Sequence, residues 1–473
     1  MLFHRVDFLI FFVVVWGSYV CLGRRAQNVL LLGASLFFYG SWNWKFLGLI
    51  AISAVVDYAA ALAIERWPAR KRIPLVASIV ANLGILFTFK YFNFFAESVA
   101  ALLSGIGMEP DFPTLHVILP VGLSFYTFQT MSYTIDVYRG RQKARRDFLT
   151  VGLFVCYFPQ LVAGPVERAR RLMPQFERAR SLDWSMITNG FWFIALGLFK
   201  KIAIADLLVP QIDPLFANLG AASLAGVAVA TFAFGVQLYA DFSGYSDMAI
   251  GLSLLLGIRL SRNFRQPLFF ARSFTDFWQR WHITMTGWFR DYVYGPLRGA
   301  SSAGARATLA LVVMFTLVGL WHGADWTFVI WGGAQGLLLL LDRAVIFRLP
   351  QARTDRWPGP LRLALAFLRG MSVSLLLTAV LFLFRLESLS DLPDELAGLS
   401  SWEDLPSSWK ELFPWLNALV LFLGIDAVSE RKRTQALPEH YPMVARFLLY
   451  LYFALAVLSA GGFTDDPYVY FQF

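Results

Sequence analysis

Long apolar runs constrain the fold of this chain more than any other feature of its sequence. Four of the clearest runs occupy residues 8–20, 76–89, 372–384 and 447–458. Such runs form the middle of helices that cross about 30 Å of hydrocarbon. The chain is also 57% hydrophobic and only 15% charged, whereas about a quarter of the residues of a soluble domain are charged. The sequence therefore predicts an all-α polytopic protein embedded in a membrane bilayer.

Charged loops set the predicted orientation of these helices. Arg24 and Arg25 follow the first span, and a second basic cluster at residues 66–72 follows the third. Basic loops favour the cytoplasm, so we expect both clusters there and the N-terminus outside. The stretches that fall on the external side in this scheme are acidic, at residues 97–114, 387–411 and 465–466. The C-terminus is therefore also expected outside.

Two shorter apolar pieces break the simple alternation of spans. Residues 148–164 are interrupted by Pro159 and Gly164, so we expect a re-entrant segment. Non-helical backbone at membrane depth needs protein or a water-filled cavity around it, and this segment is therefore expected to line a cavity. Residues 244–257 are too short to span and are expected to form a separate piece after a span at residues 222–240.

The chain is expected to form one membrane domain over residues 1–473, because no internal repeat or low-complexity linker divides it. About eleven to thirteen apolar helices with re-entrant segments are expected around a central cavity or tunnel. The motifs concentrate in a core region at residues 117–341, whose first span is expected at residues 117–135. C-terminal helices follow at residues 361–461, and an aromatic tail occupies residues 468–473.

Several functional classes are disfavoured by composition. The net charge of +9 reflects cytoplasmic loops of a membrane protein, so no nucleic-acid partner is expected. Cys21 and Cys156 are the only cysteines and lie in apolar runs, which argues against a disulfide framework or a thiolate metal site. The first apolar run has no small-residue cleavage site and is expected to be a retained helix.

Two of the five histidines have unusual surroundings. His322 lies in Trp321-His322-Gly323, near the bend of an expected apolar hairpin at residues 309–341, and His282 lies in a stretch dense in Trp, Arg and Asp at residues 273–294. A titratable imidazole at membrane depth costs free energy, so it is a functional candidate. Both are predicted to be catalytic. The alternatives are a structural histidine between helices for His322 and an interfacial or helix-packing residue for His282.

A second polar group interrupts the apolar core region. Asp241 and Asp247 stand beside Ser243 and Ser246. They form either an ion site or caps and bridges between broken helices at the cavity, and we favour the caps. Trp281, with the neighbouring tryptophans 278 and 288, is expected to anchor the chain at the membrane interface, where tryptophan is enriched. The alternative is that these rings stack on a substrate.

Several segments together resemble the membrane-bound O-acyltransferases, and more narrowly the alginate O-acetylase branch, which is related to the D-alanyl transfer protein of Gram-positive bacteria. The resemblance runs from near the N-terminus to the last residue and rests on residues 120–129, 133–140, 158–165, 241–251, 273–294 and 321–323. Two positions depart from the family pattern. Gln279 replaces a common arginine and is expected to alter donor contacts, and Gln335 stands where a second His-Gly pair is expected.

The resemblance implies transfer of an acyl group across a bacterial inner membrane. Acetyl on coenzyme A, or another cytoplasmic thioester, is the implied donor substrate, with no bound cofactor and no metal. The implied product is an ester on an exported polysaccharide such as alginate or a cell-wall polymer, formed directly or through an extracytoplasmic acetyltransferase- or esterase-like partner. A neutral imidazole is suited to accept the hydroxyl proton, which is the role expected for His322.

Further residues receive roles from the same resemblance. The basic stretch around His282 is expected to attract the phosphates of the donor. Donor-binding or cavity-lining roles are predicted for Arg280, Trp281, Asp241, Ser243, Asp247 and Asp291. In the aromatic tail, Tyr470 is predicted to relay the acyl group, with Tyr468 second. The alternative is that the tail only anchors the last helix at the interface.

Three other classes of function remain open at this point. A secondary transporter also uses broken helices and intramembrane carboxylates, but many transporters show an internal repeat, which is not found here. An intramembrane hydrolase is disfavoured because neither H-E-x-x-H nor G-x-S-x-G occurs. The third class is a non-catalytic export scaffold, which an inactive His322→Ala variant with intact partner binding would distinguish from an enzyme.

Overall fold

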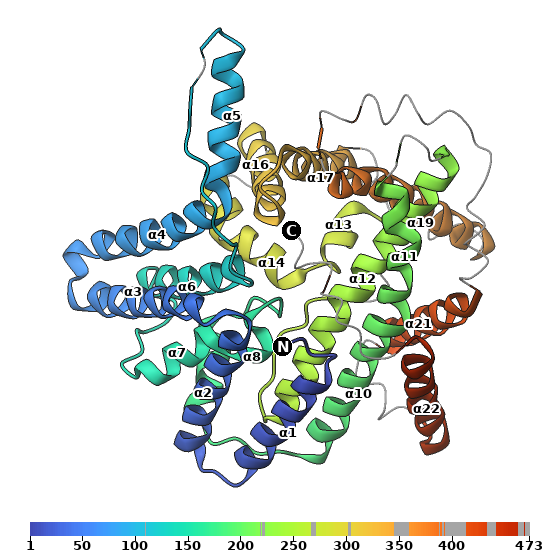
Figure 1. The fold of residues 1–473 in the computed structure, drawn as a ribbon, viewed down its shortest axis with the longest axis horizontal. Coiled ribbons are helices and arrows are strands. Elements are labelled where there is room, and N and C mark those ends of the chain that lie inside the picture. The colour runs from blue at the N-terminus through green and yellow to red at the C-terminus, as the bar shows by residue number, and fades with distance from the viewer. Residues whose placement is uncertain are drawn as a thin grey trace. The chain divides into compact units, whose positions relative to one another are not determined.

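The computed structural model describes most of the 473 residues, in ranges 1–108, 110–217, 219, 223–265, 271–300, 304–344, 359–386, 388–389, 392, 413–432, 441–461 and 468. Every regular element in these ranges is helical and none is a strand (Figure 1). The all-α prediction is therefore confirmed. Contacts divide the chain into two compact units, and the prediction of a single domain stays a prediction.

The first unit comprises Met1–Phe191 and Ala249–Ser261. Its helices are α1 (Val6–Val20), α2 (Arg24–Asn43), α3 (Leu47–Arg66), α4 (Arg72–Leu86), α5 (Phe92–Ser104), α6 (Leu123–Tyr138), α7 (Phe148–Cys156), α8 (Phe158–Leu161) and α9 (Ala169–Glu177). Short turns of 3-10 or π-helix join several of them, at Trp44–Phe46, Pro68–Arg70 and Phe87–Tyr91.

The expected interruption at residues 148–164 is present. Tyr157 separates α7 from α8, and its backbone leaves the helical region at φ −51° and ψ 108°. The amide of Phe158 donates to Ser35 Oγ on α2 at 3.0 Å. Residues on α7 and α8 are buried against protein, as irregular backbone at membrane depth requires. The broken helix is confirmed, and its re-entrant path stays a prediction.

The predicted span at residues 117–135 is wrong at its start. Helix α6 begins at Leu123, after Gly122, whose φ of 77° lies in the left-handed region. A Cβ on Gly122 would meet the carbonyl oxygen of Leu161. The chain therefore turns into α6 at a position that only glycine occupies without strain, and the apolar residues before it are outside the helix.

The second unit comprises Trp192–Met248 and Arg262–Phe473. Its elements are α10 (Trp184–Lys200) and α12 (Leu224–Leu255), which extend past its limits, and η4 (Lys201–Ala205), α11 (Asp206–Ala217), α13 (Phe274–Trp278), α14 (Ile283–Phe289), η7 (Arg290–Tyr294), α15 (Gly295–Arg298), α16 (Ala305–His322), α17 (Trp326–Ala344), α19 (Gly359–Arg385), α21 (Phe413–Lys432) and α22 (Met443–Ser459).

The division of residues 222–257 into a span and a separate short piece is wrong. Helix α12 runs unbroken over 32 residues. Gly244 packs against Gly197 of α10, and a Cβ on either glycine would approach the backbone oxygen of the other. Small residues permit such close helix packing in membranes. Gly244 therefore marks a close helix crossing, not a helix break.

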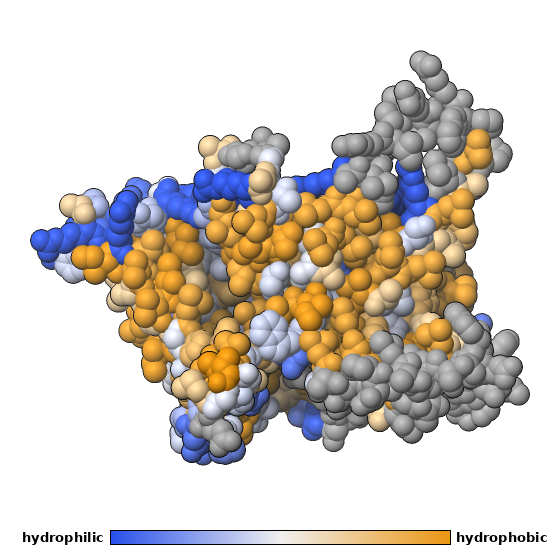
Figure 2. Space-filling model, turned by 90° about the horizontal axis from the view of Figure 1, so that it is seen from above, coloured by the Kyte–Doolittle hydropathy of each residue, from blue (hydrophilic) through white to orange (hydrophobic). Residues whose placement is uncertain are grey.

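Five helical segments in the described residues are long and apolar enough to cross a membrane: Arg24–Arg66, Arg72–Ser104, Leu224–Leu255, Ala305–His322 and Phe367–Arg385. Shorter apolar helices include α1, whose residues Leu9, Ile10 and Val14 are more than half exposed. Figure 2 shows that apolar side chains dominate the visible surface. Lipid is the natural partner of such a surface, so the multi-pass membrane prediction is confirmed, while the expected number of spans stays a prediction.

Candidate active site

The hairpin of α16 and α17 places His322 at its bend, as predicted. His322 is the last residue of α16, and α17 begins at Trp326. Gly319 and Gly332 face each other across the two helices, and a Cβ on either would collide with the opposite backbone. A Cβ on Gly323 would collide with the ring of Phe328. These glycines therefore allow the two helices to approach closely at the bend that carries His322.

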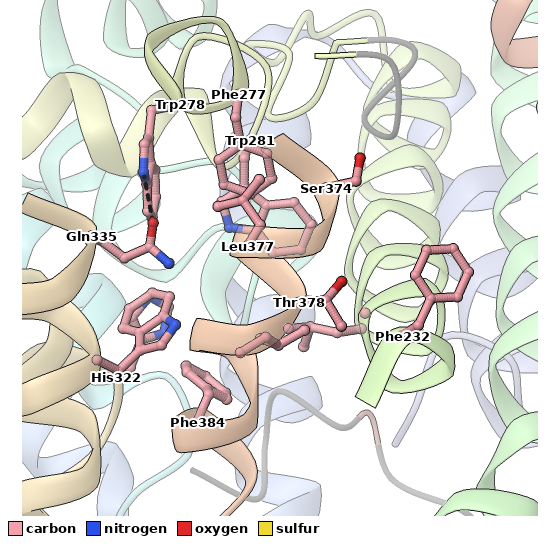
Figure 3. A pocket seen from close by; sticks show the side chains of 14 residues that line it. Phe232, Phe277, Trp278, Trp281, His322, Gln335, Ser374, Leu377, Thr378 and Phe384 are labelled. Carbon is pink, nitrogen blue, oxygen red and sulfur yellow. Dashed lines mark hydrogen bonds between the residues drawn. The ribbon is translucent and has the colours of Figure 1, made fainter. Parts of the chain in front are cut away.

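His322 lines a pocket. The space within the pocket is about 770 Å³ when its solvent-exposed mouth is included. The part of this space that can hold the centres of water-sized groups is only about 80 Å³. Helices α12, α13, α16, α17 and α19 and the turn after α13 supply its lining: Phe232, Gly235, Leu238, Phe277, Trp278, Trp281, His322, Trp331, Gln335, Ser374, Leu377, Thr378, Leu381 and Phe384 (Figure 3). The pocket is therefore mainly apolar and aromatic.

Aromatic rings hold the imidazole of His322. Its ring centroid lies 5.3 Å from Trp331 and 5.4 Å from Phe384, both edge to face. The side chain is only 5% exposed. Gln335 lies beside it in Figure 3 and accepts a hydrogen bond from Trp278 Nε1 at 3.3 Å. Gln335, which departs from the family pattern, therefore fixes a tryptophan of the pocket wall.

The short helix α13 carries two aromatic residues of the pocket, and hydrogen bonds and an ion pair hold the helix in place. Ser273 Oγ accepts the amide of Asp276 at 3.0 Å and caps the helix. The amide of Thr275 donates to Asp342 of α17 at 2.9 Å. Arg280 pairs with Asp276 at 2.7 Å. Arg280 therefore anchors the helix, while the neighbouring Trp281 lines the pocket.

His282 occupies a different setting from His322. It is 0% exposed and is the N-cap of α14, at φ 42° and ψ 50°. It is the one non-glycine residue with a positive φ in the described ranges. Such a conformation disfavours side chains with a Cβ. Two backbone hydrogen bonds between loop segments support this conformation. The amide of Ile283 donates to Asn263 O, and the amide of Arg265 donates to Arg280 O.

The tautomer of His282 follows from its partner. Asn263 Oδ1 accepts a hydrogen bond from Thr284 Oγ1 at 2.8 Å and lies 3.0 Å from His282 Nδ1. Since an amide oxygen only accepts, Nδ1 carries the proton and Nε2 carries the lone pair of the neutral ring. Burial lowers the pKa of His282 to about 3, which keeps the imidazole neutral at physiological pH.

Trp321 lies between the two histidines. Its ring centroid is 5.8 Å from that of His282 and 4.9 Å from that of His322. His282 also meets Phe242 of α12 edge to face at 4.7 Å. His282 does not line the pocket that contains His322. The structure therefore brings the predicted pair close together but places them in separate environments.

The prediction that Asp241 and Asp247 cap broken helices is wrong, because α12 is continuous there. Asp241 instead pairs with Lys201 at 2.9 Å, and Asp247 pairs with Lys200 at 2.6 Å. Ser243 lies buried on the same stretch of α12. Buried carboxylates require such partners. Helices α10 and η4 supply the two lysines to the aspartates of α12.

Three residues that are important in this region were not predicted from the sequence. Lys200 and Lys201 interrupt the apolar run at residues 191–205, and intramembrane cations are a recognised functional signal. Asn263, which positions His282, carries no such signal, because an asparagine in a loop is common.

A further predicted residue, Asp291, is not part of the lining of this pocket. Asp291 pairs with the adjacent Arg290 at 3.0 Å, and that arginine is 68% exposed. Tyr470 lies outside the described residues. Within the described ranges, no group of three or more His, Cys, Asp and Glu side chains is arranged to hold a metal ion.

Comparison with known proteins identifies the family. The family model for MBOAT, membrane-bound O-acyltransferase family, matches residues 36–361. A probable alginate O-acetylase AlgI of Azotobacter vinelandii is 41% identical over 386 residues, 78% of this chain and 74% of that protein. Another of the same name from Pseudomonas putida is 34% identical over 503 residues, 100% of both chains.

A third relative is named for a different polymer. The peptidoglycan O-acetyltransferase of Helicobacter pylori is 36% identical over 378 residues, 73% of this chain and 71% of that protein. The family match and the Pseudomonas putida relative both cover the α16–α17 hairpin. The chain therefore belongs to the membrane-bound O-acyltransferase family and is a multi-pass membrane acyltransferase.

Proposed function

We propose that this acyltransferase moves an acetyl group from a cytoplasmic thioester, acetyl-CoA in the simplest case, toward hydroxyl groups of an exported polysaccharide. The observation that carries the proposal is the placement of His322 in a mainly apolar pocket at a glycine-tightened helix bend. The names of the relatives refer to alginate and to peptidoglycan. Both polymers present sugar hydroxyls, so the proposed acceptor class is an exported glycan.

His322 is the proposed general base. It takes the proton of the acceptor hydroxyl as the oxygen attacks the thioester carbonyl carbon. A C–O bond forms, the C–S bond breaks, and the proton passes from the imidazole to the departing thiolate. The apolar walls formed by Trp281, Trp331 and Phe384 limit the water that would otherwise hydrolyse the thioester.

His282 is proposed to position the donor through the pocket wall. It is fixed by Asn263 and contacts Trp321, whose ring also meets His322. Arg280 supports the same wall through Asp276. The donor is a substrate in this scheme and no resident cofactor is invoked. Exposed basic residues of the stretch, such as Arg290, are suited to attract the donor's phosphates.

The acyl group is proposed to reach the acceptor in two transfers. Tyr470 would first accept it on its hydroxyl oxygen, as the acceptor in the step assisted by His322. A hydroxyl of an extracytoplasmic transferase or of the glycan would then attack the carbonyl carbon, the ester bond to Tyr470 would break, and the proton would return to the tyrosine oxygen. One difficult transfer is thus replaced by two easier ones. A Tyr470→Phe variant keeps the ring and removes only the oxygen that would carry the acyl group. Normal acylation by that variant would leave the tail as a membrane anchor.

The proposed setting is the bacterial inner membrane, with the N- and C-termini outside. The support is the alternation of basic and acidic loops along the sequence. Labelling of single cysteines placed at residues 25 and 111 tests this orientation, because the first is expected to react from the cytoplasm and the second from outside.

The proposal is tested by the O-acetyl content of exported glycans from cells with the wild-type chain, without it, and with His322→Ala. Loss of acetylation with unchanged abundance of the variant in the membrane is expected. The matched control is His116→Ala, because His116 is exposed and remote in sequence from the pocket. Wild-type acetylation by a well-expressed His322→Ala variant would refute the role of His322.

A further inference from the structure

A buried charge cluster lies on η4, α11 and α12 in the second unit. Lys201 Nζ pairs with Asp206 at 2.8 Å and with Asp241 at 2.9 Å. The side chains of the three residues are at most 9% exposed. A lysine buried away from water needs a carboxylate to balance its charge. Here two carboxylates pair with one ammonium group. The ammonium is thus a fixed, oriented cation at the centre of the cluster.

Tyr468 covers this cation from the C-terminal end of the chain. Lys201 Nζ lies 4.6 Å from the centroid of the Tyr468 ring, within the range of a cation–π contact. The same ring meets Tyr245 of α12 edge to face at 5.0 Å. Tyr468 is only 1% exposed. A tyrosine this buried, held on two sides, is bound in a site and is not a loose interfacial ring.

The helix that receives Tyr468 also contacts His282. Phe242 meets the imidazole of His282 at 4.7 Å, and Tyr245 follows three residues later on the same helix. Residues three apart on a helix are neighbours on its surface. Ser246, the next residue, lies 3.4 Å from Asn263, the partner of His282. One turn of α12 therefore supports both the surroundings of His282 and the contact with Tyr468.

We propose that Lys201, Asp206, Asp241 and Tyr245 form a seat for the C-terminal segment and that Tyr468 is its anchor. The seat binds a neutral aromatic side chain of the protein's own chain by its π face and its edge. Tyr468 is a positioning residue in this proposal. It ties the chain at residue 468 to the α12 turn beside His282.

The chemistry of Tyr468 favours an anchor over an acyl acceptor. An attacking tyrosine must give up its proton, but burial raises the pKa of Tyr468, and the nearby carboxylates of Asp241 and Asp206 raise it further. Its hydroxyl therefore stays protonated. This separates the two tyrosines of the tail, since the proposed relay through Tyr470 needs a hydroxyl that can be deprotonated.

Amide hydrogen exchange of the full-length protein in lipid nanodiscs tests the seat. Peptides covering the tail are compared in the wild type, Tyr468→Phe and Tyr468→Leu. Phenylalanine keeps the π face, whereas leucine keeps apolar volume without it. The matched control is Tyr138→Leu, which removes another lysine–tyrosine contact, of Lys71 over Tyr138 at 4.7 Å, far from the tail in sequence.

The expected result is that the wild type, Tyr468→Phe and the control exchange slowly, while Tyr468→Leu exchanges about tenfold faster in the tail. Equal exchange in the wild type and Tyr468→Leu would overturn the seat. Fast exchange in Tyr468→Phe would also overturn it, because the hydroxyl and not the ring would then hold the tail. Exchange requires no acyl transfer, so this outcome is independent of the proposed function.

A second measurement connects the seat to catalysis and rests on the proposed function. In Tyr468→Leu, the rate of acylation at saturating donor is expected to fall about tenfold with an unchanged KM for acetyl-CoA, because the pocket is intact. A raised KM with unchanged maximal rate would contradict a positioning role for the tail.

Discussion

His322 and His282 both contact Trp321, yet the surroundings of their rings differ. His322 borders a pocket, and aromatic rings of Trp331 and Phe384 surround it. His282 borders no part of that pocket, and its Nδ1 is tied to Asn263. Access to a cavity permits chemistry on a substrate, whereas a hydrogen bond in a closed core fixes geometry. The comparison supports the proposed roles, chemistry for His322 and positioning for His282.

The two sites also differ in how the backbone supports the ring. His322 sits at the C-terminus of α16, where glycines at 319 and 323 bring the hairpin arms together. His282 adopts a left-handed conformation at the start of α14. Such conformations persist only where surrounding contacts impose them, and they occur often at functional sites. Both histidines are thus held tightly, one by close packing and the other by hydrogen bonds.

The largest effect is expected from exchanging each imidazole for an amide. In His322→Gln the proton acceptor is lost, and acylation should fall about 10²–10⁴-fold with normal abundance in the membrane. In His282→Gln the fall should be smaller and accompanied by reduced stability. Rates from purified protein with acetyl-CoA and a glycan acceptor measure both. A larger loss of rate in His282→Gln would reverse the assignment of roles.

Gly323, next to His322, should be more sensitive to substitution than Gly287 on α14, the helix that begins after His282. Gly323→Ala forces a Cβ into the ring of Phe328, and such overpacking costs about 1–3 kcal/mol. Gly287→Ala on α14 is the matched control, because a Cβ there meets nothing within 4 Å. Unfolding in SDS, monitored by circular dichroism, measures the difference. Equal stability of the two variants would show that the hairpin bend relaxes without loss.

The buried neutral state of His282 predicts a dependence of stability on pH. In the unfolded chain His282 takes up a proton below its ordinary pKa of 6.5, whereas the folded protein resists protonation down to about pH 3. Stability therefore falls as the pH drops from 6.5 toward 3, by up to about 1.4 kcal/mol per pH unit from this group. Above pH 6.5 the contribution is constant. Unfolding midpoints from pH 7 to 4.5 should show a shallower slope in His282→Gln, and identical slopes would contradict the buried neutral ring.

The smallest expected effect concerns the left-handed backbone of His282. His282→Ala and His282→Gly both remove the ring and its bond to Asn263. Glycine adopts a φ of 42° without strain, whereas alanine does not. The glycine variant should therefore be more stable than the alanine variant by about 1 kcal/mol, the reverse of their order in a helix. The difference between their unfolding midpoints measures this, and a more stable alanine variant would show that the backbone relaxes at this position.

The sequence predicted the parts of this site that depend on local pattern. Helices follow from the long apolar runs, and the bend at Trp321-His322-Gly323 follows from the polar interruption of an apolar hairpin. The break near Tyr157 follows from Pro159 and Gly164. Where the pattern was ambiguous, the prediction was wrong. Residues 244–257 were predicted to be a separate piece, but they continue α12, because Gly244 permits close packing of two helices.

By itself, then, the sequence determined a helical membrane protein, the hairpin that carries His322, and through its motifs the family, because hydrophobic periodicity and motif spacing are local along the chain. Only the tertiary structure decided that Lys200 and Lys201 neutralise Asp247 and Asp241, that Asn263 sets the tautomer of His282, and that Tyr468 covers Lys201. Each of these contacts joins residues separated by many positions in sequence. Their partners are selected by the cost of burying charge and polar groups away from water, which no local pattern records.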